Sequence, residues 1–197
     1  MDEDGLRYVV ADGTGPMGRY FRKHHRHFLW MDGFILIYDD VECYECGKVS
    51  FLLHAKENNT FKMLSPATVE TRRGYIDGEY KETNCTYTVY NTPTDDEAHA
   101  KFLGVILLDE SKTVEFSELT DAWKVVCGDT TVYVNRRADG KIAHRNCINV
   151  MDDYVTDAEL VIEQNGRHAV ANGSLLRKNG ESILEVLARV TGWTDKN

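Results

Sequence analysis

Short apolar or β-branched segments separated by turn residues fill residues 102–164, and this pattern constrains the fold more than any other feature. The segments read FLGVILLDESKTVEF, AWKVVCGDTTVYVNRR, KIAHRNCINVM and DAELVIEQ, with Gly, Asp, Ser or Asn about every eight to twelve residues. A βαβ fold would instead alternate strands with helical patterns. The sequence therefore predicts a mainly β fold, either an antiparallel barrel or a sandwich.

The clearest predicted hairpin of this stretch turns at Asp139-Gly140. Both residues can adopt the positive φ angles that a two-residue type I′ turn requires. Such a turn pairs Tyr133 with Asn146 and Val132 with Cys147. Further strands are expected at residues 6–11, 34–38, 48–55, 60–64, 68–72 and 86–90.

Three segments have helical patterns. In residues 19–31, apolar or aromatic side chains fall near one helical face. Residues 94–101 suit one or two helical turns capped by Thr94. Near the C-terminus, Ser182 and Glu185 form a capping box. A stripe at helical spacing follows: Ile183, Leu184, Val186, Leu187 and Val190. We expect a helix over 183–191 that packs on the outside of the sheet.

Length and charge limit the partners. A chain of 197 residues predicts one β-rich domain, 1–197, that ends in this helix. The net charge of −9 argues against nucleic acid, since phosphate binding needs a concentrated basic face. The longest apolar runs, FILIY and GVILL, are too short to span a bilayer. The expected partner is a small-molecule ligand or a host protein.

The five cysteines allow two interpretations, namely disulfides with one thiol left over or five reduced thiols. We expect at least one disulfide, in which Cys127 and Cys147 pair with other cysteines rather than with each other. The available partners are Cys85 and either Cys43 or Cys46. Three Asn-x-Ser/Thr sites begin at residues 58, 84 and 172, so a secreted glycoprotein is favoured, or a cytoplasmic protein if the cysteines are reduced.

A Gly-x-Gly-x-x-Gly motif at Gly13, Gly15 and Gly18 supports an alternative function. It follows a strand, may precede a helix, and is followed about twenty residues later by Asp39. That order matches a dinucleotide-binding fingerprint, in which a helix N-terminus holds the pyrophosphate and a carboxylate binds the ribose. The match covers only residues 6–40, and the rest of the chain looks antiparallel.

Two metal sites are weaker alternatives. Cys43-x-x-Cys46 has the spacing of half a zinc site, which two of His24, His25 and His27 would complete. His25-x-His27 together with His168 resembles the ligand set of cupins, although no Glu follows the pair at the usual spacing. No motif for a catalytic triad, a zinc protease or a Walker lysine is present, so a binding protein is favoured over an enzyme.

One group of motifs resembles a known family. Phe116-Ser117-Glu118, Cys127-Gly128, Val132–Val134 and Cys147 are similar to the later strands of the divergent lipocalins of tick saliva. The family's later cysteine and its Gly-x-Trp are missing here. The resemblance implies an eight-stranded antiparallel barrel with a C-terminal helix and an internal cavity.

Aromatic residues in or beside the predicted strands are the candidates to line such a cavity, because they offer a ring and a polar tip. They are Trp30, Tyr38, Tyr90, Trp123 and Tyr133. The leading hypothesis is a binding protein without a cofactor or metal that holds a small amphipathic ligand or acts through its surface on another protein. The alternatives are a nucleotide-cofactor enzyme and a cupin-type metal enzyme.

Overall fold

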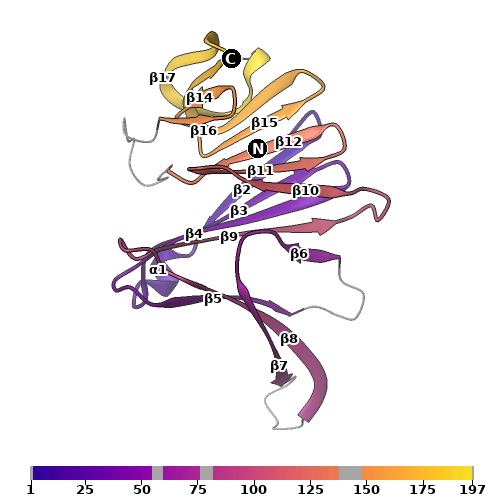
Figure 1. Ribbon diagram of the computed structural model, residues 1–197, viewed down its shortest axis with the longest axis vertical. Coiled ribbons are helices and arrows are strands. Elements are labelled where there is room, and N and C mark those ends of the chain that lie inside the picture. Colours follow the sequence, from indigo (N-terminus) through magenta and orange to yellow (C-terminus); the bar gives the residue numbers. More distant parts are fainter. Residues whose placement is uncertain (1, 55–59, 76–81, 138–147, 197) are drawn as a thin grey trace. The chain divides into compact units, whose positions relative to one another are not determined.

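The computed structural model describes residues 2–54, 60–75, 82–137 and 148–196 (Figure 1). The chain divides into two compact units, one of residues 7–110 and the other of residues 1–6 with 111–197. Both consist of antiparallel strands, and one sheet curls into a half-barrel. The predicted mainly β, antiparallel fold class is therefore confirmed.

The first unit, residues 7–110, has two sheets. Strands of the larger sheet lie in the order β2-β3-β4-β9-β6 and those of the smaller one in the order β5-β8-β7. The elements are β2 (Leu6–Asp12), α1 (Thr14–Met17), β3 (Phe21–Met31), β4 (Phe34–Cys43), β5 (Lys48–His54), β6 (Phe61–Met63), β7 (Thr68–Tyr75), β8 (Glu82–Pro93) and β9 (His99–Leu107).

The second unit contains a sheet with the order β10-β11-β12-β15-β16-β14-β13, in which β17 also pairs with β16. The elements are β1 (Asp2–Glu3), β10 (Val114–Glu118), β11 (Ala122–Cys127), β12 (Thr130–Asn135), β13 (Asn149–Met151), β14 (Tyr154–Thr156), β15 (Leu160–Gln164), β16 (Arg167–Lys178), β17 (Glu181–Trp193) and the 3-10 helix η2 (Thr194–Lys196).

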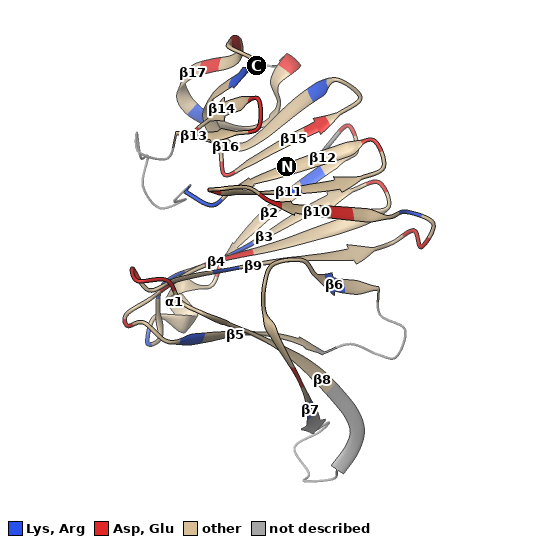
Figure 2. Cartoon of the chain, viewed as in Figure 1, with Lys and Arg blue, Asp and Glu red and all other residues tan. Residues whose placement is uncertain are grey.

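Each unit has an apolar cluster that its strands build by alternation. In the first unit, Ile37 of β4 and Phe102 of β9 belong to a cluster with Phe51 of β5 and Phe61 of β6, and the Phe51 and Phe61 rings stack at 5.7 Å. In the second unit, Tyr133, Tyr154 and other buried residues from β11 to β17 form a separate cluster. In Figure 2, Lys and Arg lie interspersed with acidic residues along both units.

The three predicted helices are wrong. Residues 21–31 form strand β3, and residues 94–98 form a turn that leads into β9. The C-terminal segment 181–193 is strand β17, joined to β16 by Asn179 and Gly180 at φ angles of 52° and 85°. These positive angles belong to a type I′ hairpin, so the pairing with β16 replaces the helix. No helix in the described part of the chain is long and apolar enough to cross a membrane.

The predicted register of β12 is also wrong. Tyr133 lies opposite Lys124 of β11 on one side and Val161 of β15 on the other, so neither edge of β12 is left for Asn146. Asp139-Gly140 itself lies outside the described residues. The other predicted strands of the N-terminal half are present as β2 and β4 to β8, with shifted ends.

Candidate functional site

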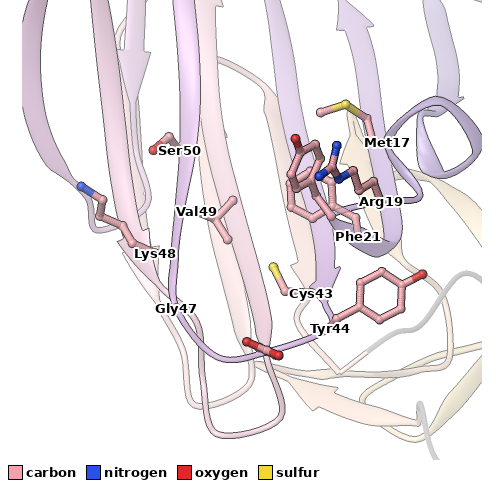
Figure 3. A pocket seen from close by; sticks show the side chains of 11 residues that line it. Met17, Arg19, Phe21, Cys43, Tyr44, Gly47, Lys48, Val49 and Ser50 are labelled. Carbon is pink, nitrogen blue, oxygen red and sulfur yellow. The ribbon is translucent and has the colours of Figure 1, made fainter.

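A pocket of about 570 Å³ lies in the first unit, where the start of β3 and the end of β4 meet the start of β5 (Figure 3). This volume falls within the range of small-molecule sites. Its lining comes from three short segments: the turn after α1, the connection from β4 to β5, and the first residues of β5. The pocket is therefore made of turn residues together with the strand ends that they join.

The antiparallel pairing of β3 with β4 forms the floor of this pocket. Phe21 at the start of β3 lies opposite Cys43 at the end of β4. Val49 of β5 is buried and faces the same space, whereas its neighbours Lys48 and Ser50 point the other way in Figure 3, as alternation along a strand requires. The floor is consequently apolar, with one thiol among its side chains.

Hydrogen bonds between turns fix the walls. The Tyr44 hydroxyl donates to the Gly18 carbonyl at 3.0 Å, which ties the β4–β5 connection to the turn after α1. The Gly47 amide donates to the Thr94 hydroxyl at 2.9 Å, and the Thr94 amide donates to the Gly47 carbonyl at 2.8 Å. Both ends of the connection are thus anchored, so the pocket is built before any ligand arrives.

Aromatic and cationic groups form the rim. Tyr20 and Tyr44 are 62% and 51% exposed, so parts of both rings can be reached by a ligand. The Arg19 guanidinium lies 5.8 Å from the Tyr20 ring, and that of Arg22 lies 5.4 Å from the Tyr44 ring. The lining also holds one carboxylate, Glu45, while the charge of Lys48, although its residue borders the pocket, points away from Val49 (Figure 3). The cations at the rim are therefore Arg19 and the neighbouring Arg22.

A second polar group, the buried charge cluster, lies on β3, β4 and β9. Asp40 accepts from Lys23 Nζ at 2.8 Å and from Lys101 Nζ at 2.6 Å, and Lys101 also donates to the Tyr38 hydroxyl at 3.0 Å. Although burial alone would raise the pKa of Asp40, the charges of Lys101 and Lys23 hold it well below its usual range. The aspartate is therefore ionised and binds the three strands together.

His27 lies beside this cluster. Its Nδ1 is 2.7 Å from the Tyr8 hydroxyl, and its ring centroid is 5.0 Å from that of Tyr38. Its Nε2 is buried and meets no hydrogen-bond partner among the residues that the structure describes. Burial lowers the pKa of His27 to about 3, against a smaller opposing effect of Asp40. The imidazole is consequently neutral at physiological pH.

The five aromatic residues predicted to line a cavity do not gather in either unit. Trp30 and Tyr38 lie on opposite faces of their sheet, because Trp30 pairs with Ile35, which is three residues from Tyr38. Tyr90 packs on Phe51 and Phe61. In the second unit, Trp123 and Tyr133 likewise lie on opposite faces, since Trp123 pairs with Val134. None of the five is among the residues that line the pocket.

The glycine motif lacks the context of a dinucleotide site. β2 and β3 are antiparallel neighbours, and the helix between them spans only Thr14–Met17. A Cβ on Gly13 would lie 2.6 Å from His24 Nδ1, so close packing explains this glycine. Asp39 accepts two hydrogen bonds from Arg26, both at 2.6 Å, and does not reach toward the glycines.

The predicted metal sites do not form among the described residues, where no group of three His, Cys, Asp or Glu side chains is placed to hold an ion. For the zinc hypothesis, His24 packs against Gly13 and the ring of Phe21, and His27 points to Tyr8. For the cupin hypothesis, His25 and His27 belong to the first unit and His168 to the second.

Cys43, Cys46 and Cys127 are thiols rather than half-cystines. The predicted disulfides through these three residues are therefore not present in the structure, and Cys85 and Cys147 lie outside the described side chains. Secretion consequently loses the support that those disulfides would have given.

No family model matches the chain, and no curated protein matches its sequence.

Proposed function

We propose that this chain is a non-enzymatic binding protein that holds a small, anionic amphipathic ligand in the pocket at the β4–β5 connection. The observation that supports this most directly is the pairing of an apolar floor, from Phe21 and Val49, with a rim of exposed tyrosines and Arg19. An apolar body fits the floor, and an acidic or aromatic head group fits the rim.

The local charge favours an anion. Arg19 lies on the rim, and the Arg22 guanidinium lies 5.4 Å from the ring of Tyr44, while the whole chain carries a net charge of −9. A cationic ligand would be attracted to much of the remaining surface, whereas an anion would be attracted to the rim of the pocket. Added salt should therefore weaken the binding of an anion. The lipocalin resemblance stays a prediction, and the pocket supports ligand binding without it.

The fluorescent dye anilinonaphthalene sulfonate is a suitable probe, because it is an aromatic anion of the proposed class. Tyr44→Ala removes a rim ring and should weaken dye binding about two- to twelvefold, since an aromatic contact contributes roughly 0.5–1.5 kcal/mol. Arg19→Gln should weaken binding about threefold, the range of an exposed ion pair. Titrations at low and high salt measure both effects.

The matched controls are Trp30→Ala, which removes an exposed ring outside the pocket, and Lys62→Gln, which removes an exposed charge on β6. Both should leave the dye affinity unchanged. Equal dye affinity in the pocket variants and the wild-type protein would show that the pocket is not the binding site. A loss with Trp30→Ala alone would instead favour the exposed rings of the sheet.

A further inference from the structure

We propose that Cys43 and Cys46 form a redox-active dithiol, which closes a reversible disulfide when it exchanges with a low-molecular-weight disulfide such as oxidised glutathione. This chemistry requires only the two thiols and the loop that carries them, and no ligand of the pocket takes part.

The loop brings the two cysteines together. β4 ends at Cys43, and the chain then bends sharply at Tyr44, Glu45 and Cys46 before β5 begins at Lys48. Both cysteines border the same turn before β9, since the Cys43 amide donates to the Ala98 carbonyl at 2.9 Å and the Cys46 thiol lies 3.4 Å from the Asp95 carbonyl. A disulfide needs Cα atoms within roughly 7 Å, a separation that two residues three positions apart can reach across a bend. The thiols also interact electrostatically, since the charge of Cys46 contributes to the raised pKa of Cys43.

The loop has room for the small adjustment that the bond requires. A Cβ on Gly47, which follows Cys46, would meet nothing within 4 Å. The Cys46 thiol lies near two backbone carbonyls, those of Asp95 at 3.4 Å and Asp96 at 3.7 Å, and these weak contacts are the ones its rotation would break. The anchors at Tyr44 and Gly47 use other atoms and can remain.

Different exposure gives the two thiols different roles. Cys46 is exposed, whereas Cys43 is only partly exposed and lines the pocket. Burial, followed by the nearby charges of Cys46 and Glu42, raises the pKa of Cys43 and disfavours its thiolate. Cys46 is therefore the thiol that first meets an external disulfide, and Cys43 completes the exchange from inside.

The exchange balances in two steps. The Cys46 thiolate attacks one sulfur of oxidised glutathione, a Cys46–glutathione bond forms, and one glutathione thiolate leaves. The Cys43 thiolate then attacks the Cys46 sulfur, the Cys43–Cys46 bond forms, and the second glutathione thiolate leaves. Two electrons pass from the protein to the glutathione, and the two protein thiol protons end on the two released glutathione thiols.

Peptide mapping of the native full-length chain tests this. After incubation with oxidised glutathione and alkylation of remaining thiols, the tryptic peptide from His27 to Lys48 should be unalkylated and lighter by two hydrogens. Further cleavage after Glu45 should leave its two parts joined until a reductant is added. Reduced glutathione in excess should restore the two alkylated cysteines.

Single variants separate the two roles. Cys43→Ser should stop the exchange at the first step and accumulate glutathione on Cys46, whereas Cys46→Ser should leave Cys43 largely alkylated. Cys127→Ser, which changes a buried thiol of the other unit, should leave the 43–46 disulfide intact. The inference is overturned if the wild-type peptide carries glutathione without the internal bond, or if both cysteines stay alkylated at every glutathione ratio.

Discussion

The two units use buried polar groups differently. In the first, the buried charge cluster places Asp40 between Lys23 and Lys101, all from different strands, with side chains 2%, 3% and 15% exposed. In the second, the buried Asp157 accepts from the amides of Ser174 and Leu175 and from the Ser174 hydroxyl, and the Arg189 guanidinium lies 4.0 Å away. Asn135 donates to the Ala158 carbonyl. The first unit therefore pairs buried charges in direct contact, whereas the second relies mainly on neutral donors and acceptors.

The difference has energetic consequences. A charge that leaves water is costly, and its partner repays that cost only while both are present. A carboxylate that accepts hydrogen bonds from backbone N–H groups can be replaced by an Asn side chain, whose carbonyl oxygen accepts the same hydrogen bonds. The first unit should therefore be the more sensitive to charge-removing substitutions and to acid.

The largest expected effect follows from removing the shared carboxylate. Asp40→Asn removes the buried anion that Lys23 and Lys101 share and should lower the free energy of unfolding by about 3–5 kcal/mol, as for other broken buried pairs. The corresponding change in the second unit, Asp157→Asn, keeps the acceptor for the Ser174 and Leu175 amides and should cost about 1–2 kcal/mol. Urea unfolding measures both.

Hydrogen exchange locates each loss. Asp40→Asn should speed exchange in β3, β4 and β9, and Asp157→Asn in β16. Equal losses of stability for the two variants would contradict the distinction between the units.

Acid should act next, through His27. Its folded pKa is about 3, against about 6.5 in an unfolded chain. Between these values the unfolded chain binds a proton that the native one does not. The free energy of unfolding therefore decreases as the pH is lowered, by up to about 1.4 kcal/mol per pH unit. Asp40, whose folded pKa is depressed, adds a further loss below about pH 4.

His27→Gln is the variant that tests this dependence. It keeps a group able to bond with the Tyr8 hydroxyl but removes the titration, so the slope of stability against pH between 6.5 and 4 should flatten. His168→Gln in the second unit is the control. Burial also lowers the pKa of His168, but this residue is only partly buried and its removal should change the slope less. An unchanged slope in His27→Gln would show that His27 is not the source.

The same buried polar groups explain why strand β3 was predicted as a helix. Lys23, His27, Leu29 and Met31 are buried and share one face at the strand period of two. A Lys and a His on that face look polar in the sequence, so the alternation is hidden, and the remaining aromatic residues fall by chance at helical spacing. Only the partner, Asp40, explains why Lys23 can be inside.

The strand pattern of 102–164, by contrast, was predictable because its buried positions are apolar. The missed C-terminal hairpin also had a signal: Asn179-Gly180 is the dipeptide that type I′ turns prefer, and Asn165-Gly166 joins β15 to β16 in the same way. The capping box at Ser182 led instead to the prediction of a helix, which was wrong. The pocket had no signal, because turn residues from separate segments form it and turns carry no periodic pattern.

The smallest expected change, that of Leu187→Ala, serves with Leu184→Ala to separate the two descriptions of the C-terminal segment. In a helix, Leu184 and Leu187 lie on one face, and both would pack on the sheet at similar cost when replaced. In strand β17, Leu184 is 4% exposed within the apolar cluster, whereas Leu187 is fully exposed. Leu184→Ala should therefore lower the free energy of unfolding by about 2–4 kcal/mol, and Leu187→Ala should change it by less than about 0.5 kcal/mol. Urea unfolding of the two variants side by side measures the ratio. Equal losses of stability in the two variants would support a helix over this segment, because both leucines would then pack on the same face.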